Sequence, residues 1–261
     1  MIEYLLILSL VQGITEFLPI SSSAHLMIIN YFSGTYDQSI SVDLSLHIGS
    51  ILALAVYFLR NPLKTQIRQK YNHYFLTSRS TIYLILFSAI PTMILAYVFL
   101  NYNLIYAVRE NIQVIVWCNL IFAILLFLAD FLGKKSNKSI KNRHILVLAV
   151  FQSMSLIPGV SRSGICLTIS RFLGFDRSKS SVVAVIMSIP ILFASLLFVV
   201  VEIYSEQNLF LTNTILMSIT LSFITSYISI KIMIEFIDRI KFYPFVIYRV
   251  CLSLLMLYYI Y

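Results

Sequence analysis

The chain has 261 residues, of which 59% are hydrophobic and only 11% are charged. Soluble domains carry about 25% charged residues, so this composition indicates an integral membrane protein and excludes an ordinary soluble enzyme. The net charge of +8 is concentrated in loops, because five of the 19 Lys and Arg residues lie within 60–79 and five more within 134–143. Such clustering follows the positive-inside rule rather than forming a basic face. We therefore expect membrane lipids as partners and no nucleic acid.

The first apolar region, 2–32, is interrupted near its centre by Pro19 and the serines that follow it. A spanning helix needs about 20 apolar residues, so this region is too short for two spans. It fits a helix that enters the membrane, turns and returns, with its irregular turn buried in protein. We therefore predict a re-entrant helical hairpin. The opening residues lack a basic region and a cleavage site, so we expect no removable signal peptide.

The rest of the chain repeats one order of elements, a broken apolar region followed by three apolar segments of spanning length. The elements in chain order are the spans 41–59, 81–100 and 112–132, the region 144–173 broken at Pro158, and the spans 180–201, 211–230 and 244–261. We predict an all-α integral membrane protein with about six transmembrane helices and two re-entrant hairpins. If the basic loops lie in the cytoplasm, both chain ends fall outside and the hairpins enter from opposite faces.

The two halves of the chain share a weak internal match at a constant spacing of 140 residues. That spacing maps Gln12, Ser21 and Ser23 onto Gln152, Ser161 and Ser163. We predict a single membrane domain, 1–261, made of two inverted repeats, 1–133 and 134–261. In such proteins the site lies at the repeat interface and is built by discontinuous helices. The alternative is a chance alignment of two apolar regions.

Polar groups gather at both predicted breaks. In each hairpin the second helix begins at the break, so its free N–H groups and dipole favour an anion at the membrane centre. Ser22 and Ser161 are suitable N-caps. The first break adds Glu16 and His25, and the second adds Arg162, whose forked guanidinium matches phosphate oxygens. Together these groups indicate a site that handles phosphate.

Gln12 and Glu16 lie four residues apart, on one face of the first helix. A Glu at membrane depth must be protonated, paired with an Arg, or bound to a cation. Because phosphate esters usually arrive with Mg²⁺ or Ca²⁺, we expect a divalent cation held by Glu16 and Gln12.

Each polar residue also has a purely structural interpretation. The serines at 21–23 could only cap a helix and satisfy backbone groups at the break, and His25 could be a hydrogen-bonded core histidine. Arg162 without an anion would be costly at membrane depth, so its structural alternative is a salt bridge to Glu16. On the spanning helices, we expect His47 to pack or make an outer contact to the site. We expect Arg249 to extend to the cytoplasmic surface.

The sequence QGITEFLPISSSAHL, Gln12–Leu26, resembles a signature of the undecaprenyl-diphosphatase family, also called the bacitracin-resistance UppP/BacA family. The sequence PGVSRSG, Pro158–Gly164, is similar to a second motif of that family, and further similarity covers 46–53, 174–190 and 244–249. The resemblance implies a multi-pass bacterial membrane enzyme with paired re-entrant hairpins. It also implies the removal of the terminal phosphate of a polyprenyl diphosphate lipid, which recycles the carrier for peptidoglycan synthesis and confers bacitracin resistance.

The resemblance and the residue chemistry together assign candidate roles. The catalytic residues are Glu16, Ser22, His25 and Arg162; the phosphate-binding residues are Ser21, Ser23, Ser161, Arg162, Ser163 and Gly164; the cation ligands are Glu16 and Gln12. The family often has Glu at the position of Gln12 and usually has Thr at the position of Cys166. The second change removes a hydroxyl contact to phosphate or passes it to a neighbour such as Thr168.

Two mechanisms fit these residues, with the pocket open to the external face of the bacterial inner membrane. Ser22 attacks phosphorus with Glu16 or His25 as its base, or water attacks while Glu16 holds the metal and His25 protonates the leaving group. A different class of function is a transporter or flippase for polyprenyl phosphate, because inverted repeats with broken helices are typical of transporters. An intramembrane serine protease is a further alternative, but peptide hydrolysis would give the phosphate-binding type of side chain at Arg162 no role. The oligomeric state stays open.

Overall fold

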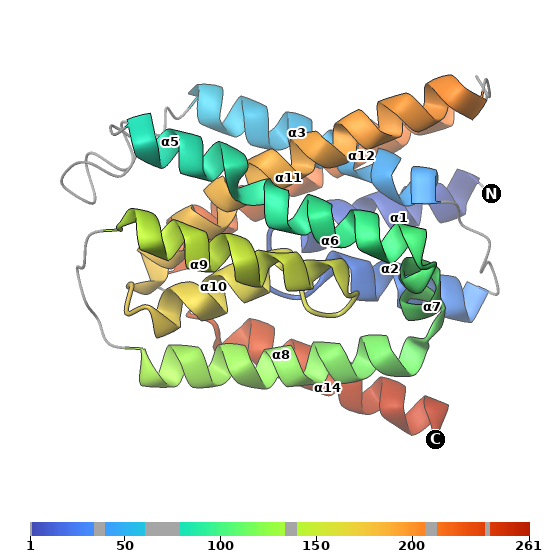
Figure 1. Cartoon of the computed structure of the whole chain (residues 1–261). Coiled ribbons are helices and arrows are strands. Elements are labelled where there is room, and N and C mark those ends of the chain that lie inside the picture. Colours follow the sequence, from blue (N-terminus) through green and yellow to red (C-terminus); the bar gives the residue numbers. More distant parts are fainter. Residues whose placement is uncertain (1, 34–39, 61–78, 134–139, 207–212, 238–240) are drawn as a thin grey trace.

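The computed structural model describes residues 2–33, 40–60, 79–133, 140–206, 213–237 and 241–261, and all regular secondary structure within them is helical (Figure 1). The helices are α1 (Ile2–Thr15), α2 (Ser22–Ser33), α3 (Ile40–Arg60), α5 (Arg79–Leu86), the 3₁₀ turn η1 (Phe87–Ala89), α6 (Ile90–Asn101), α7 (Leu104–Glu110), α8 (Ile112–Leu132), α9 (Asn142–Gln152), the 3₁₀ turn η2 (Ser153–Leu156), α10 (Arg162–Phe172), α11 (Arg177–Glu206), α12 (Asn213–Lys231), the π-helical turn η3 (Ile232–Phe236) and α14 (Tyr243–Ile260). The predicted all-α fold is confirmed.

Five of the helices in the described ranges are long and apolar enough to cross a membrane. They are Ile82–Asn101, Ile112–Leu132, Arg177–Ala194, Leu216–Glu235 and Tyr243–Ile260. The remaining predicted span forms α3, of which Leu46–Arg60 is a shorter apolar stretch. These helices are those of a multi-pass membrane protein, and their positions agree with the spans predicted from the sequence.

Two shorter helical pairs enter the bundle from opposite ends, and their breaks meet inside it. Helix α1 starts at the end of the bundle that carries both chain termini, and α2 returns toward that end (Figure 1). Helices α9 and α10 form a similar pair that enters from the opposite end. The breaks touch each other, because Ser163 Oγ donates a 2.9 Å hydrogen bond to the carbonyl of Leu18. The helix–break–helix form predicted for both regions is therefore present.

The two breaks share an unusual backbone conformation at positions 140 residues apart in the sequence. Ser21 has φ 69° and Ser161 has φ 70°, in the left-handed region that costs a non-Gly residue about 1–3 kcal/mol. In each break the serine hydroxyl then accepts a backbone N–H three residues later, from Ala24 at 3.4 Å and from Gly164 at 3.1 Å. This agreement supports the predicted inverted repeats, which stay a prediction.

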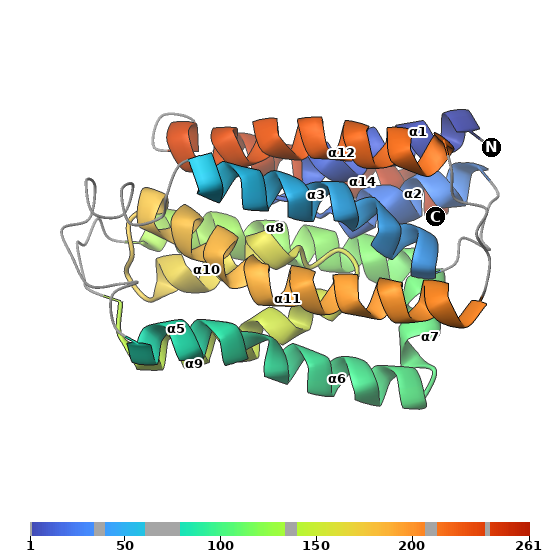
Figure 2. The same cartoon turned by 90° about the horizontal axis from the view of Figure 1, so that it is seen from above.

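Helix α12 lies against both α1 and α3, as seen from above in Figure 2. The contact is close because glycines face it: a Cβ on Gly49 would lie 2.4 Å from the carbonyl oxygen of Ile219. Small hydroxyls complete the interface, since Ser222 Oγ donates to the Leu46 carbonyl at 3.0 Å and Ser229 Oγ to the Ile14 carbonyl at 2.8 Å. Small residues of this kind let membrane helices approach closely, and here they anchor α1, the helix that leads to Glu16.

The far end of the second hairpin is held by a buried charge cluster. Asp130 on α8 accepts hydrogen bonds from Arg171 Nε on α10 at 3.1 Å and from Arg177 Nε on α11 at 2.8 Å. Removing one partner of such a buried pair would leave an uncompensated charge. The cluster therefore ties α10 to its neighbours and sets the direction in which α10 points its N-terminus.

Gly49→Val is expected to destabilise the protein by about 1–3 kcal/mol, because the added methyl groups collide with backbone atoms of α12 that cannot move aside. Thermal unfolding in detergent, followed by circular dichroism, measures the loss. Ala55→Val, at an exposed position on the same helix, is the control and should unfold like the wild type. Equal stability of the two variants would contradict the glycine-mediated contact.

Candidate active site

Glu16 is the first residue after α1, and its carboxylate is buried between the two hairpins, with 4% of the side chain exposed. Its N–H continues the helical pattern by donating to the Gln12 carbonyl at 2.9 Å, which places the side chain on the same face as that of Gln12. Oε1 forms an ion pair with Arg162, the first residue of α10. This ion pair is the structural alternative that was stated for Arg162, and it joins one break to the other.

The second oxygen of the Glu16 carboxylate contacts three further side chains. Oε2 accepts hydrogen bonds from Ser22 Oγ and from Gln12 Nε2, both at 2.7 Å, and it lies 3.5 Å from His47 Nε2. Because Ser22 donates its hydroxyl hydrogen to a carboxylate, the pair has the arrangement of a nucleophile and its base. His47 makes the outer contact to the site that was one of the two expectations for it.

The cap of α2 is Ser21 rather than Ser22, which corrects the sequence-based assignment by one residue. Ser21 Oγ accepts the N–H of Ala24, whereas the predicted cap of α10, Ser161, is confirmed by its bond to the N–H of Gly164. Helix α2 begins at Ser22, so Ser21 takes the N-cap position, as Ser161 does before α10. The Ser22 hydroxyl bonds Glu16 instead.

The residues predicted to bind phosphate line the two helix starts. Ser21 Oγ lies 3.3 Å from Ser23 Oγ, and the corresponding pair in the second hairpin, Ser161 and Ser163, is separated by 3.2 Å. Gly164 places its N–H on the Ser161 hydroxyl. These groups therefore bond one another within the breaks, and a phosphate must replace some of those bonds to use them.

His25 contacts groups other than Ser22 and Glu16. Its Nδ1 lies 2.7 Å from the Ser21 carbonyl oxygen, and its Nε2 lies 2.7 Å from the Tyr248 hydroxyl on α14. Sequence reasoning left either Glu16 or His25 as the base for Ser22, and the observed bonds pair Ser22 with Glu16. Tyr248 was missed, because one Tyr in an apolar helix rich in aromatic residues carries no distinguishing signal.

Arg249 is completely buried, so the expectation that it extends to the cytoplasmic surface is wrong. Its guanidinium donates to Asn119 Oδ1 at 2.8 Å, to the Gly159 carbonyl at 2.7 Å and to the Pro19 carbonyl at 3.4 Å. Those two carbonyls belong to the two breaks, where no helix supplies a donor. An Arg inside an apolar span was the available signal, but sequence could not tell which way its side chain turns.

Cys166 lies four residues after Arg162 in α10 and contacts Gln152 on α9. Its Sγ is 3.6 Å from Gln152 Oε1, and 1% of the residue is exposed. The hydroxyl of Thr168, suggested as a replacement contact to phosphate, donates to the Gly164 carbonyl of its own helix at 2.8 Å. The lost Thr hydroxyl at position 166 is therefore not restored by Thr168 in this arrangement.

Few side chains of the site are available as ligands for a cation. Within the described ranges, no group of three or more His, Cys, Asp or Glu side chains is arranged to hold a metal ion. Gln12 Oε1 is nevertheless a buried acceptor without a hydrogen-bond partner, beside the Glu16 carboxylate. Mg²⁺ is commonly bound by one or two protein ligands together with substrate phosphates. The residues therefore fit a cation that arrives with the phosphate substrate.

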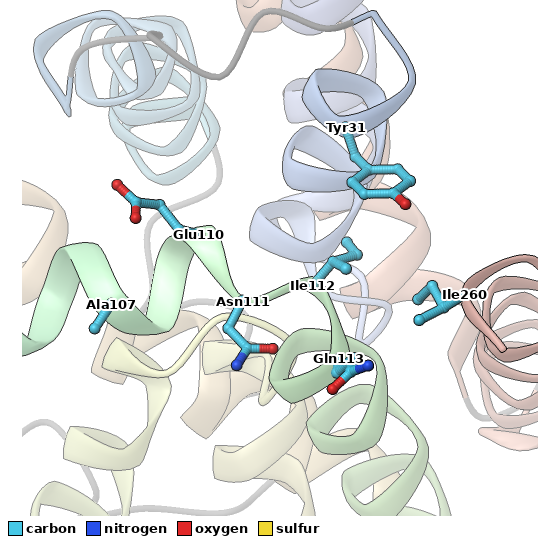
Figure 3. Close-up of a pocket in the computed structure, with 7 residues that line it drawn as sticks. All are labelled: Tyr31, Ala107, Glu110, Asn111, Ile112, Gln113 and Ile260. Carbon is cyan, nitrogen blue, oxygen red and sulfur yellow. The ribbon is translucent and has the colours of Figure 1, made fainter.

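A separate surface pocket of about 440 Å³ lies where the ends of α2, α7, α8 and α14 meet (Figure 3). It is lined by Tyr31, Ala107, Glu110, Asn111, Ile112, Gln113 and Ile260. None of these residues belongs to the Glu16 cluster. The pocket is thus distinct from the place where the polar side chains of the hairpins converge.

Residues 5–255 match the family described as Bacitracin resistance protein BacA. The chain belongs to this family. It is 39% identical to the undecaprenyl-diphosphatase of Pelagibacter ubique (strain HTCC1062), over 98% of this chain and 97% of the relative. It is 36% identical to that of Jannaschia sp. (strain CCS1), over 97% and 96%, and 33% identical to that of Campylobacter curvus (strain 525.92), over 98% and 98%. The BacA resemblance in the two motifs therefore extends along nearly the whole chain.

Arg249→Met is expected to lower stability strongly, because it removes the donor from two buried acceptors, Asn119 Oδ1 and the Gly159 carbonyl. Each acceptor left unsatisfied costs about 1–3 kcal/mol. Thermal unfolding in detergent measures the effect, and Arg143→Met, at an exposed position, removes the same charge as a control. If both variants unfolded at the same temperature, Arg249 would not hold the breaks together.

Proposed function

We propose that this chain is a membrane phosphatase that hydrolyses undecaprenyl diphosphate to undecaprenyl phosphate and inorganic phosphate. Its BacA relatives bear the name undecaprenyl-diphosphatase. The observation that carries the proposal is the bonding of Glu16, which binds Arg162 through one oxygen and Ser22 through the other. The proposed base Glu16, the proposed nucleophile Ser22 and the phosphate-binding guanidinium of Arg162 are thereby joined in one cluster that comes from both hairpins.

The proposed first step is an in-line attack by Ser22 Oγ on the terminal phosphorus. Glu16 takes the hydroxyl proton, and the bond between that phosphorus and the bridging oxygen breaks, so that undecaprenyl phosphate leaves. Phosphate is a good leaving group and needs no added proton here. The product of this step is a phosphorylated Ser22.

The proposed second step is the attack of water on phosphorylated Ser22. His25 lies three residues after Ser22 in α2, so the two side chains share a helix face. Its Nδ1 is bonded to a carbonyl oxygen, which leaves Nε2 to accept the water proton. Glu16 returns its proton to Ser22 Oγ as the phosphorus–oxygen bond breaks and inorganic phosphate forms. The proton on His25 Nε2 then passes to the departing phosphate, which restores the neutral imidazole.

Arg162 stabilises the charge of the transferring phosphoryl group in both steps. Its guanidinium has five N–H donors, so it can hold phosphate oxygens while keeping a bond to Glu16. A preorganised positive charge of this kind supplies most of the catalysis in phosphoryl transfer. The N-terminus of α10, which begins at Arg162, adds its dipole in the same place.

We further propose a divalent cation, Mg²⁺ or Ca²⁺, as cofactor, held by Glu16 and Gln12 Oε1 with oxygens of the substrate. When bound, it would neutralise phosphate charge. The proposed location is the bacterial inner membrane, with the site open to the external face. There the reaction would recycle the lipid carrier for peptidoglycan synthesis and so confer bacitracin resistance.

Purified protein in detergent with Mg²⁺ is expected to release phosphate from undecaprenyl diphosphate, as measured by a colorimetric phosphate assay. Arg162→Ala should slow this release about 10²–10³-fold, because it removes a preorganised charge from the transition state. Arg143→Ala removes an exposed positive charge and serves as the control. Wild-type protein that moved polyprenyl phosphate across vesicles without releasing phosphate would instead support a transporter.

Ser22→Ala is expected to abolish phosphate release, because it removes the nucleophile. Rapid acid quenching of wild-type protein with radiolabelled substrate should trap phosphoserine at position 22. Ser33→Ala, at the exposed end of the same helix, should keep both activity and the trapped label. Full activity of Ser22→Ala would exclude the serine nucleophile and leave direct attack by water.

A further inference from the structure

Tyr248 on α14 is bonded to the catalytic candidate His25 on α2, although 223 residues separate them in the sequence. The tyrosine hydroxyl lies 2.7 Å from His25 Nε2. The two rings are nearly parallel, with an angle of 2° between their planes and 5.5 Å between their centroids. The phenol thus contacts the ring nitrogen that the second step of the proposed reaction needs.

The chemistry of the two contacts defines where the proton of a neutral His25 ring sits. The carbonyl oxygen of Ser21 can only accept, so Nδ1, at 2.7 Å, must donate to it. Nε2 then carries a lone pair, and Tyr248 must be the donor of the second bond. A backbone carbonyl on one side and a phenol on the other therefore hold the ring as a base.

Arg249, the next residue in α14, fixes the position of Tyr248 relative to α2. Arg249 bonds the Gly159 carbonyl of one break and, more weakly, the Pro19 carbonyl of the other. Because these bonds fix the rotation and height of α14 against both hairpins, they also fix the phenol against α2. The Tyr248 side of this contact is open, since 45% of the residue is exposed, whereas Glu16 is buried, with 6% exposed.

We propose that Tyr248 is a positioning residue for the hydrolysis of phosphorylated Ser22. It keeps His25 Nε2 unprotonated until the attacking water replaces the phenol as the donor to that nitrogen. The inference rests on the proposed phosphatase function and assigns Tyr248 to the second step alone, because the first step uses Glu16 as its base.

The test is Tyr248→Phe, which keeps the stacked ring and removes one oxygen atom. In the phosphate-release assay we expect kcat to fall about tenfold, as a share of the 10²–10⁴-fold that a general base contributes. Because only the second step slows, KM should fall with kcat and kcat/KM should change by less than about twofold. Acid-quenched Tyr248→Phe should also contain more phosphoserine than the wild type. A merely structural role would lower kcat/KM and would not raise the phosphoserine level.

Tyr258→Phe is the matched control, because it removes the same hydroxyl from the same helix at a residue that is 82% exposed. It should match the wild type in every measurement. A double variant tests whether Tyr248 acts through His25: in the His25→Ala background, adding Tyr248→Phe should change kcat by less than about twofold. A further tenfold loss in that background, or unchanged kcat in the single variant, would overturn the proposal.

Nitrogen NMR of protein with ¹⁵N-labelled histidine provides a readout that does not need activity. The His25 signals are assigned by their loss in His25→Ala, and Tyr248→Phe should move the Nε2 signal while Tyr258→Phe leaves it in place. An unmoved signal would overturn the inference even in an active enzyme. If the wild-type protein released no phosphate, the proposed function itself would fail. If the wild type were active and Tyr248→Phe were indistinguishable from it, only the role of Tyr248 would fail.

Discussion

A helix that stops inside apolar surroundings leaves backbone carbonyls without donors, and this protein stops two of them in the same place. The guanidinium of Arg249 supplies the missing donors. It donates to the carbonyl of Gly159 in one break and to the carbonyl of Pro19 in the other, and its third bond is to Asn119 Oδ1. A buried unsatisfied carbonyl is costly in a membrane, where no water can replace the missing partner. Arg249 on a spanning helix therefore stabilises the place where the two hairpins meet, and with it the polar cluster.

Once the breaks are joined, the charges of the site follow. Glu16 enters from one hairpin and Arg162 from the other, and each would be prohibitive alone in an apolar interior. Their pairing was the structural alternative to a phosphate site, but the Glu16 carboxylate has further bonds besides this ion pair. The second oxygen of Glu16 also accepts the Ser22 hydroxyl, a bond that charge balance does not require. That surplus interaction is what makes the cluster suited to chemistry as well as to stability.

Sequence rules predicted correctly those features that depend only on neighbouring residues, namely the helix breaks and one of the two N-caps. Pro19 and Pro158, each beside a run of polar residues, predicted both helix breaks, and the serine N-cap at Ser161 formed as expected. The cap of the first hairpin was misplaced by one residue, because three consecutive serines at 21–23 are equally suitable N-cap types and α2 begins at Ser22. The family motifs brought Glu16, Ser22 and Arg162 together as candidates, and the side-chain bonds between them agree with that grouping.

The sequence by itself determined the membrane class, the helical spans, the two broken hairpins and the identity of the charged residues at their breaks, because hydropathy and helix-breaking residues act over a few turns of chain. Only the tertiary structure decided that Arg249 turns inward, that Tyr248 meets His25, and that Ser22 bonds Glu16 rather than His25. The first two outcomes depend on how α14 is rotated against two hairpins far away in the sequence, and the third depends on the conformation of the first break. Rotation of a helix within a packed bundle is set by all of its neighbours at once, and no local pattern contains that information.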